Sequence, residues 1–96
     1  MAVKILIKRT FKEGTLKDAA AMLIKSRAIA IEQNGYIASE SLVGYDDPNT
    51  ILVLSMWQKK EDWDNYKKSA ARKENERNYA KIMDGVTEYD VFKIGM

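Results

Sequence analysis

In four stretches of the chain, apolar and polar positions can be sorted into two rows with a period of two, which is the period of a β-strand. The four predicted strands cover residues 2–9, 36–45, 50–57 and 86–94. The third strand is unusual because both of its faces are apolar. One face would carry Ile51, Val53, Ser55 and Trp57, and the other Leu52, Leu54 and Met56. A strand of this kind lies inside a sheet whose two faces are both covered.

Two helical regions separate these strands. In the first, from residue 16 to about residue 33, apolar side chains recur every three or four positions. Its main stripe would consist of Leu16, Ala19, Ala20, Leu23, Arg27, Ala30 and Ile31, broadened by Met22, Ile24 and Ile29. We expect Thr15 to cap the start of this helix and Asn34-Gly35 to end it, with Gly35 or Asn34 in the left-handed conformation. The second region, residues 59–83, begins with an aromatic segment, and Ser69 would cap its second half.

The element order β-α-β-β-α-β is typical of a ferredoxin-like α+β sandwich, an antiparallel sheet with both helices on one face. We expect all of residues 1–96 to form one such domain. The sheet face without helices would carry an apolar row from each strand, which is too much to leave in water. Two copies that pack these faces together would form a dimeric α/β barrel. The sequence therefore predicts a homodimer.

The composition excludes several kinds of chemistry. The chain has no cysteine and no histidine, so disulfides, thiolate catalysis and the commonest metal and haem ligand are absent. The net charge of +2, with basic residues interleaved among acidic ones, does not favour nucleic acid as a partner. No apolar run could span a bilayer, and the first nine residues are too short for a signal peptide. We expect a soluble cytoplasmic protein without metal, membrane or nucleic-acid partners.

One family resemblance extends over nearly the whole chain. Residues 53–77 read VLSMWQKKEDWDNYKKSAARKENER, with NGYIASESLVGYDDPNTI before them and VTEYDVFKI after them. This sequence resembles the antibiotic biosynthesis monooxygenase (ABM) family, most specifically where Trp57 ends a strand before an acidic, aromatic helix. The resemblance implies a dimeric α+β barrel. Members of the family include cofactor-free monooxygenases of aromatic polyketides and quinols, haem-degrading enzymes, and an isomerase of a phosphorylated sugar.

The resemblance also implies roles for individual positions. The polyketide oxygenases of the family hold a phenolic substrate with a strand Trp, a helical aromatic residue and a helical Arg, which match Trp57, Trp63 and Arg77. Their strand Asn, which would take or hold the phenol proton, is replaced here by Val53. The haem-degrading branch uses a His, a Trp and an Asn. Glu76, Tyr66 and Ile7 stand at those positions, so haem degradation is disfavoured.

These matches and the residue chemistry define a candidate site between sheet and helices. The catalytic candidates are Trp57, Arg77 and Tyr66, and the substrate-binding candidates are Trp63, Arg27, Val53, Glu76 and Leu23. The two arginines and the tyrosine hydroxyl would stabilise a substrate anion. Glu40 or Glu76 could serve as a base if burial raised its pKa. Each residue also has a purely structural interpretation, with the aromatics as core, Arg27 as a solvated helix-end side chain and the acids at the surface.

The sequence thus favours a cofactor-independent monooxygenase acting on a small aromatic, quinol or polyketide-like substrate. One alternative is a non-enzymatic or stress-related small-molecule-binding protein of the same fold, and another is an isomerase or lyase of a small metabolite. The polarity of the pocket discriminates among them. A dry aromatic pocket would favour quinols, whereas a basic pocket would favour phosphorylated or carboxylated ligands.

Overall fold

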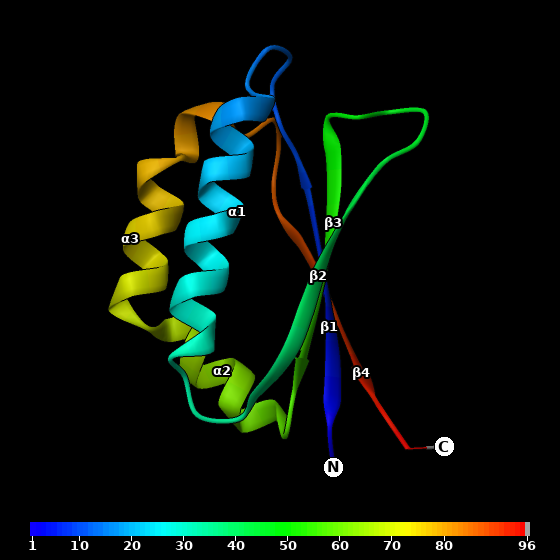
Figure 1. The fold of residues 1–96 in the computed structure, drawn as a ribbon, viewed down its shortest axis with the longest axis vertical. Helices are drawn as coiled ribbons and strands as arrows, with labels where there is room; N and C mark the ends of the chain where they lie inside the picture. Colours follow the sequence, from blue (N-terminus) through cyan, green and yellow to red (C-terminus); the bar gives the residue numbers. More distant parts are fainter. Residues whose placement is uncertain (96) are drawn as a thin grey trace.

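The computed structural model describes residues 1–95 and has two layers, a sheet and a layer of helices (Figure 1). The sheet is antiparallel, with the strand order β2-β3-β1-β4. The strands are β1 (Val3–Thr10), β2 (Tyr36–Val43), β3 (Thr50–Trp57) and β4 (Glu88–Lys93). The helices are α1 (Leu16–Ile31), α2 (Lys60–Lys68) and α3 (Ala70–Asn78), followed by the short 3₁₀ helix η1 (Ala80–Ile82). The predicted α+β ferredoxin-like fold is confirmed, with β3 in the interior of the sheet.

The start of α1 is confirmed, because the helix begins at Leu16 with Thr15 at the cap position. The Thr15 hydroxyl, however, donates to the carbonyl oxygen of Lys12 at 2.6 Å and makes no side-chain capping bond to the helix. The hydroxyl closes the preceding turn instead. The helix ends at Ile31, slightly before the predicted end, and Gly35 turns the chain into β2 with a φ of 83°. This positive φ is the conformation for which a glycine was expected.

The second helical region is divided as its cap predicts. The Ser69 Oγ accepts a hydrogen bond from the backbone N–H of Arg72 at 3.3 Å, which confirms Ser69 as the cap of α3. The part after Ser69 was predicted to be one helix up to residue 83. Instead α3 stops at Asn78, and the chain continues as the short 3₁₀ helix η1. The fourth strand is also shorter than predicted, because it begins at Glu88 and leaves Val86 85% exposed.

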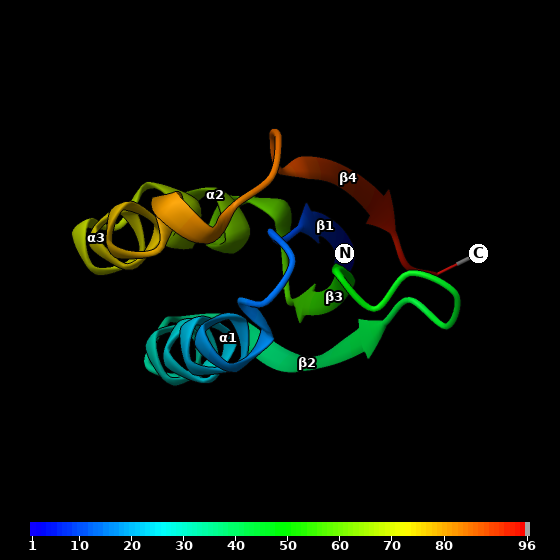
Figure 2. The ribbon, with the colours of Figure 1, turned by 90° about the horizontal axis from the view of Figure 1, so that it is seen from above.

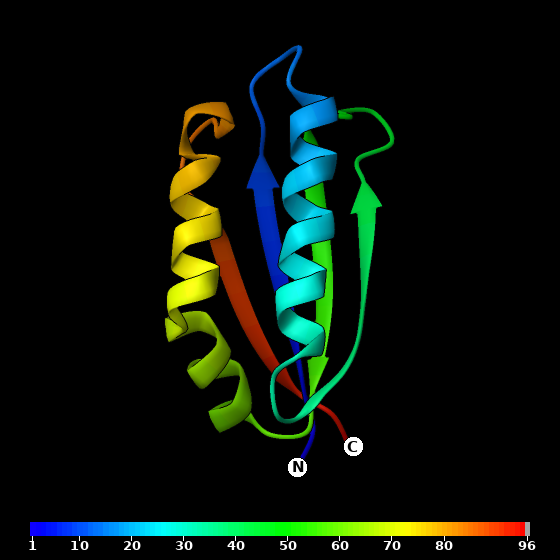
Figure 3. The ribbon, with the colours of Figure 1, turned by 60° about the vertical axis from the view of Figure 1, so that its left-hand side comes forward.

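The helices cover one face of the sheet (Figures 2 and 3). Alternate apolar residues of β1 and β3 point toward the helices, on one face of each strand as the alternation predicts. The buried residues of this face include Val3, Ile5, Ile7, Ile51 and Trp57. On α1 the buried side is narrower than the predicted stripe, because Ala19, Met22 and Ala30 are buried while Leu16 and Ile31 are 39% and 55% exposed. The cause is that α1 packs against α3 as well as the sheet, and the Asn75 Nδ2 donates to the carbonyl of Met22 at 3.2 Å.

No described element covers the opposite face of the sheet (Figure 2). At its centre Leu6 pairs with Leu54 across the β1 and β3 strands. Leu52, Leu54 and Met56 are only half-buried, and Phe92 on β4 is 54% exposed. We refer to this surface as the open sheet face. In residues 1–95, no helix is long and apolar enough to cross a membrane.

Candidate functional site

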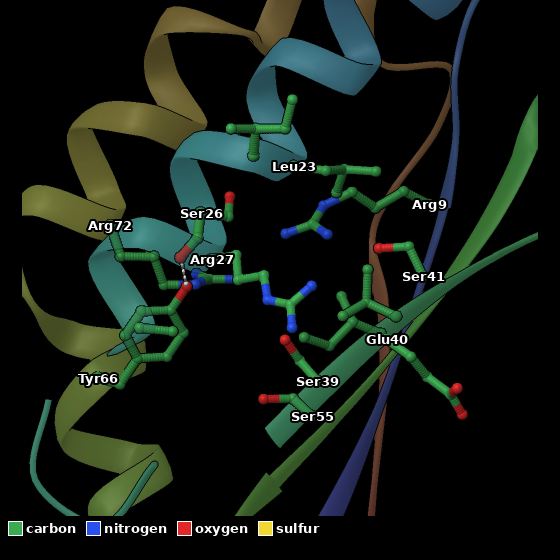
Figure 4. Close-up of a pocket in the computed structure, with 14 residues that line it drawn as sticks. Arg9, Leu23, Ser26, Arg27, Ser39, Glu40, Ser41, Ser55, Tyr66 and Arg72 are labelled. Carbon is green, nitrogen blue, oxygen red and sulfur yellow. Dashed lines mark hydrogen bonds between the residues drawn. The ribbon is translucent and has the colours of Figure 1, made fainter. Parts of the chain in front are cut away.

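A cavity of about 140 Å³ lies between the sheet and α1 (Figure 4). The apolar lining consists of Ile7 and Val53 from the sheet and Leu23, Ile24 and Ala30 from α1. The polar lining consists of Arg9, Arg27, Arg72, Ser26, Ser39, Ser41, Ser55, Glu40 and Tyr66. The cavity is therefore rich in hydrogen-bond donors and basic, with apolar side chains on both the sheet and the helix.

Two of these arginines share one carboxylate. The Glu76 Oε1 lies 2.6 Å from the Nη2 of Arg9 and 2.9 Å from the Nη2 of Arg72. The side chains of Arg9 and Arg72 are only 3% and 7% exposed, against 24% for Glu76. Burial by itself lowers the pKa of Arg72, but Tyr89, whose hydroxyl accepts from Arg72 at 2.6 Å, and Glu76 outweigh it and raise this pKa above its ordinary value. Both arginines therefore carry positive charge next to the cavity.

The third arginine has a different environment. Arg27 is exposed at the mouth of the cavity, and within residues 1–95 it makes no side-chain hydrogen bond or ion pair. Figure 4 shows its guanidinium group directed into the cavity, which Arg9 also lines. The carboxylate of Glu40, in contrast, points away from the arginines. Arg27 therefore brings a positive charge without an acid partner among residues 1–95, whereas Arg9 is paired with Glu76.

An aromatic cluster supports the cavity from behind. Trp57 is fully buried, stacks on Tyr66 with ring centroids 5.1 Å apart, and donates its Nε1–H to the Ser55 Oγ at 2.7 Å. Trp63 packs on both rings, and the guanidinium of Arg72 lies 5.9 Å from its centroid. Trp57 and Trp63 thus hold cavity residues in place without lining the cavity.

Tyr66 is the aromatic residue whose hydroxyl reaches the cavity. It donates to the Ser26 carbonyl at 3.2 Å. Burial raises the pKa of Tyr66, and the nearby charge of Arg72 offsets this only in part. The hydroxyl therefore stays protonated at neutral pH and does not act as a base, and its single hydrogen is donated to Ser26. The described residues contain no cluster of three or more acidic metal-ligand side chains.

Residues 2–77 match the family described as antibiotic biosynthesis monooxygenase, which accounts for most of the chain. The chain belongs to the ABM family. Its fold agrees with this assignment, since the sheet order and helix placement are those of solved ABM structures. No curated protein matches the chain significantly.

Solved structures share the fold over nearly the full chain. A putative antibiotic biosynthesis monooxygenase from Nitrosomonas europaea has a TM-score of 0.87 at 13% identity, covering 95% of this chain and 88% of its own. SnoaB, a cofactor-independent oxygenase from Streptomyces nogalater, has a TM-score of 0.87 at 13% identity, covering 99% and 94%. A conserved protein from Methanosarcina mazei has a TM-score of 0.88 at 16% identity, covering 97% and 92%. At such identities the likeness shows the fold alone.

The candidate residues of this ABM protein separate into three groups. Leu23, Arg27, Val53 and Tyr66 line the cavity. Trp57, Trp63 and Glu76 lie behind it, where the tryptophans pack and Glu76 pairs with the two arginines. Arg77 is exposed on α3 and does not line the cavity. Their roles in catalysis and binding remain predictions.

The structure corrects the choice of helical arginine. Residues 72 and 77 are five positions apart, so they point in directions that differ by roughly 140° around the axis of α3. Arg72 faces the cavity and Arg77 faces solvent. Arg72, rather than the predicted Arg77, is therefore the arginine of α3 that lines the cavity. Glu40 and Glu76 also lack the surroundings of a base, since Glu40 is exposed and Glu76 is held by two cations.

Sequence reasoning missed Arg9 as a cavity residue, although a signal was present. Arg9 continues the alternation of Val3, Ile5 and Ile7, so the period of two places it on the buried face of β1. A charged residue in phase with a buried row needs a partner, and Glu76 on α3 is that partner. The pairing itself joins residues 67 positions apart and has no local sequence signal.

Proposed function

We propose that this ABM protein is a homodimer whose cavity binds a small phenolic or quinol-type molecule as an anion and oxygenates it without a cofactor. The observation that carries the proposal is that Arg9, Arg27 and Arg72 line one cavity together with apolar side chains of the sheet and α1. Membership of the ABM family supports it. So does the fold shared with SnoaB, a cofactor-independent oxygenase, although at 13% identity.

The charged side of the cavity would generate the reactive form of the substrate. Positive charge beside a phenol favours its anion and lowers its pKa. The buried guanidinium of Arg9 would stabilise that anion by hydrogen bonding, and the protonated hydroxyl of Tyr66 would do so if it turned from the Ser26 carbonyl to the substrate. This removes the need for a carboxylate base inside the cavity, and the phenol proton would leave through the mouth beside Arg27. The substitution of the family Asn by Val53 is compatible with this route.

The apolar residues that line the cavity would position the aromatic ring of the substrate. Ile7, Leu23 and Val53 offer a surface against which an aromatic ring packs, so the anion is oriented and partly shielded from water. An electron-rich anion of this kind transfers an electron directly to O2. In the complete reaction a ring C–H becomes C=O, the phenol becomes a second C=O, one oxygen atom enters the product and the other leaves as water. The substrate supplies all four electrons, so the balance requires no other reductant.

The homodimer would be built from the open sheet face. Leu6, Leu54 and Phe92 lie there, and a second copy related by a two-fold axis would cover the same residues on both protomers. In sedimentation, the protein should have twice the chain mass at micromolar concentration. A Leu54→Lys variant should sediment as a monomer, whereas Ile31→Lys, at an exposed apolar position on α1, should remain dimeric. A well-folded wild-type monomer would exclude the dimer.

Oxygen consumption tests the reaction. A panel of hydroquinones and anthrones is incubated with and without O2, and uptake and ¹⁸O incorporation are measured. We expect uptake above the buffer rate, with one labelled oxygen atom per product and no equivalent amount of hydrogen peroxide. Leu23→Trp, which fills the cavity from α1, should abolish uptake, while Lys25→Trp on the solvent side of the same helix should not. Uptake at the buffer rate for every compound would refute the oxygenase proposal.

A second candidate function is ligand binding without turnover. It is favoured by the lack of a well-placed base, since Glu40 points away and Glu76 is held by two arginines. In that case the cavity would still bind phenols, and Leu23→Trp would abolish binding. Equilibrium binding of a hydroquinone without any O2 uptake would favour this candidate over the oxygenase.

A further inference from the structure

The charges around the cavity do not balance. Three guanidinium groups, those of Arg9, Arg27 and Arg72, line it, while one carboxylate, that of Glu76, is bonded to two of them. Glu40 lies outside this group, because its carboxylate points away (Figure 4). These three guanidinium groups and one carboxylate have a net charge of +2, of which +1 belongs to the buried group of Arg9, Arg72 and Glu76. Buried charge that is only partly compensated is costly, so a ligand that carries negative charge should be favoured here.

Arg9 also has an unused donor. Its side chain is 3% exposed, its Nη2 is bonded to Glu76, and its Nε has no hydrogen-bond partner. Buried polar groups of proteins nearly always have a partner, and an unpaired donor on a charged group is especially unfavourable. Because Arg9 lines the cavity (Figure 4), a small movement of its side chain on binding would bring this donor to an acceptor atom of the bound molecule.

Arg27 indicates a second anionic position at the mouth. It is exposed and could direct its charge into solvent, yet its guanidinium points into the cavity that Arg9 also lines. Like charges repel, and an anion between or beside them removes this repulsion. The two positions differ in depth, since Arg9 is buried and Arg27 is at the opening. The arrangement suits a ligand with one anionic oxygen inside and another at its outer end.

The volume limits the size of this ligand. An apolar protein cavity of about 150 Å³ binds one molecule of benzene. The present cavity, of about 140 Å³, therefore has room for a single aromatic ring, with substituents directed at the arginines and the mouth. Three or four fused rings would extend out of it.

We propose that the ligand is a single-ring phenol that carries a carboxylate, a hydroxybenzoate-type molecule, with its phenolic oxygen near Arg9 and its carboxylate at Arg27. The inference rests on the proposed function, because it assigns the substrate class of the same cavity. A planar guanidinium can bind a carboxylate through two parallel hydrogen bonds, which favours a carboxylate at Arg27.

The test compares two molecules that differ only in this group, 2,5-dihydroxybenzoate and hydroquinone, by calorimetry under anaerobic conditions. The wild-type protein should bind 2,5-dihydroxybenzoate at least about tenfold more tightly, since a charge-assisted hydrogen bond commonly contributes that much. The difference should shrink as salt is added. Arg27→Gln should remove the preference and change hydroquinone affinity less than about threefold. Lys25→Gln, which removes an exposed charge from the same helix, should leave both affinities unchanged.

The outcomes separate this inference from the proposed function. If hydroquinone binds and 2,5-dihydroxybenzoate binds no better, the carboxylate assignment is wrong and the phenol site stands. If phenyl phosphate binds more tightly than 2,5-dihydroxybenzoate, a phosphate monoester replaces the carboxylate. If none of the three binds to the wild-type protein, both proposals fail. Persistence of the full preference in Arg27→Gln would also overturn the role of Arg27.

Discussion

Replacing Glu76 by Gln tests whether the buried arginines depend on one negative charge. Glu76 Oε1 is bonded to Arg9 at 2.6 Å and to Arg72 at 2.9 Å, and the two arginine side chains are almost fully buried. The amide of Gln keeps an oxygen that can accept hydrogen bonds, so the change removes mainly the charge. The two guanidinium groups would then lie close together without compensation.

The expected cost follows from this geometry. Removing one partner of a fully buried ion pair costs about 3–5 kcal/mol. Glu76 is 24% exposed, and the Gln oxygen preserves some bonding, so we expect a loss of about 2–3 kcal/mol in the free energy of unfolding. Since a domain of this size is stable by roughly 5–14 kcal/mol, the variant should still fold. Its Tm should fall by about 10–20 °C.

Urea and thermal denaturation at one fixed protein concentration measure this loss, because a dimer would make stability concentration-dependent. Glu74→Gln is the matched control, since Glu74 is an exposed residue of the same helix and forms no ion pair within residues 1–95. It should change the stability by less than about 0.5 kcal/mol. A Glu76→Gln variant within that same margin of the wild type would refute the dependence of Arg9 and Arg72 on this carboxylate.

Three further predictions concern the surroundings of the cavity. Ser55→Ala leaves the buried Trp57 N–H without its acceptor and should cost about 1–3 kcal/mol in urea denaturation; an unchanged midpoint would show that another acceptor replaces it. The pKa of Tyr66 is raised in the folded protein, so its contribution to stability is present below about pH 10 and lost as the pH rises further. Between pH 9 and 11 the Tm should therefore fall less steeply in Tyr66→Phe than in the wild type, and parallel curves would contradict this. Gly35→Ala places a Cβ at a φ of 83° and 2.0 Å from the Asp62 Oδ2, so it should destabilise by more than the 1–2 kcal/mol of the backbone strain alone; a smaller loss would mean that Asp62 moves away freely.

Much of the fold could be predicted from local patterns. Alternation identified the four strands and placed Val53, Ser55 and Trp57 on the face that the helices cover. Side-chain direction in a strand depends only on the position in the chain, so this part succeeds. The predicted apolar row from every strand on the opposite face is wrong, because β3 alone supplies one there, while Lys8 of β1 and Asp90 of β4 lie on the same face.

The helix stripe was harder to predict. The sequence places apolar residues on several sides of α1, and the side that is buried depends on what packs there. Contact with α3 as well as with the sheet buries Met22 and leaves Ile31 exposed. Periodicity alone could not reveal this, because it does not contain the position of the second helix.

Local patterns in the sequence were enough to predict the strands, the approximate helices and the capping of α3 by Ser69. The absence of cysteine and histidine excluded disulfides, thiolate catalysis and histidine ligands. Which charged residues meet, in contrast, depends on the tertiary structure. Arg72, and not Arg77, lines the cavity because packing sets the rotation of α3 about its axis. Arg9 reaches Glu76 because the fold brings β1 and α3 together across 67 positions of the chain. Pairings of this kind depend on distances in space, and a linear pattern of residues does not encode those distances locally.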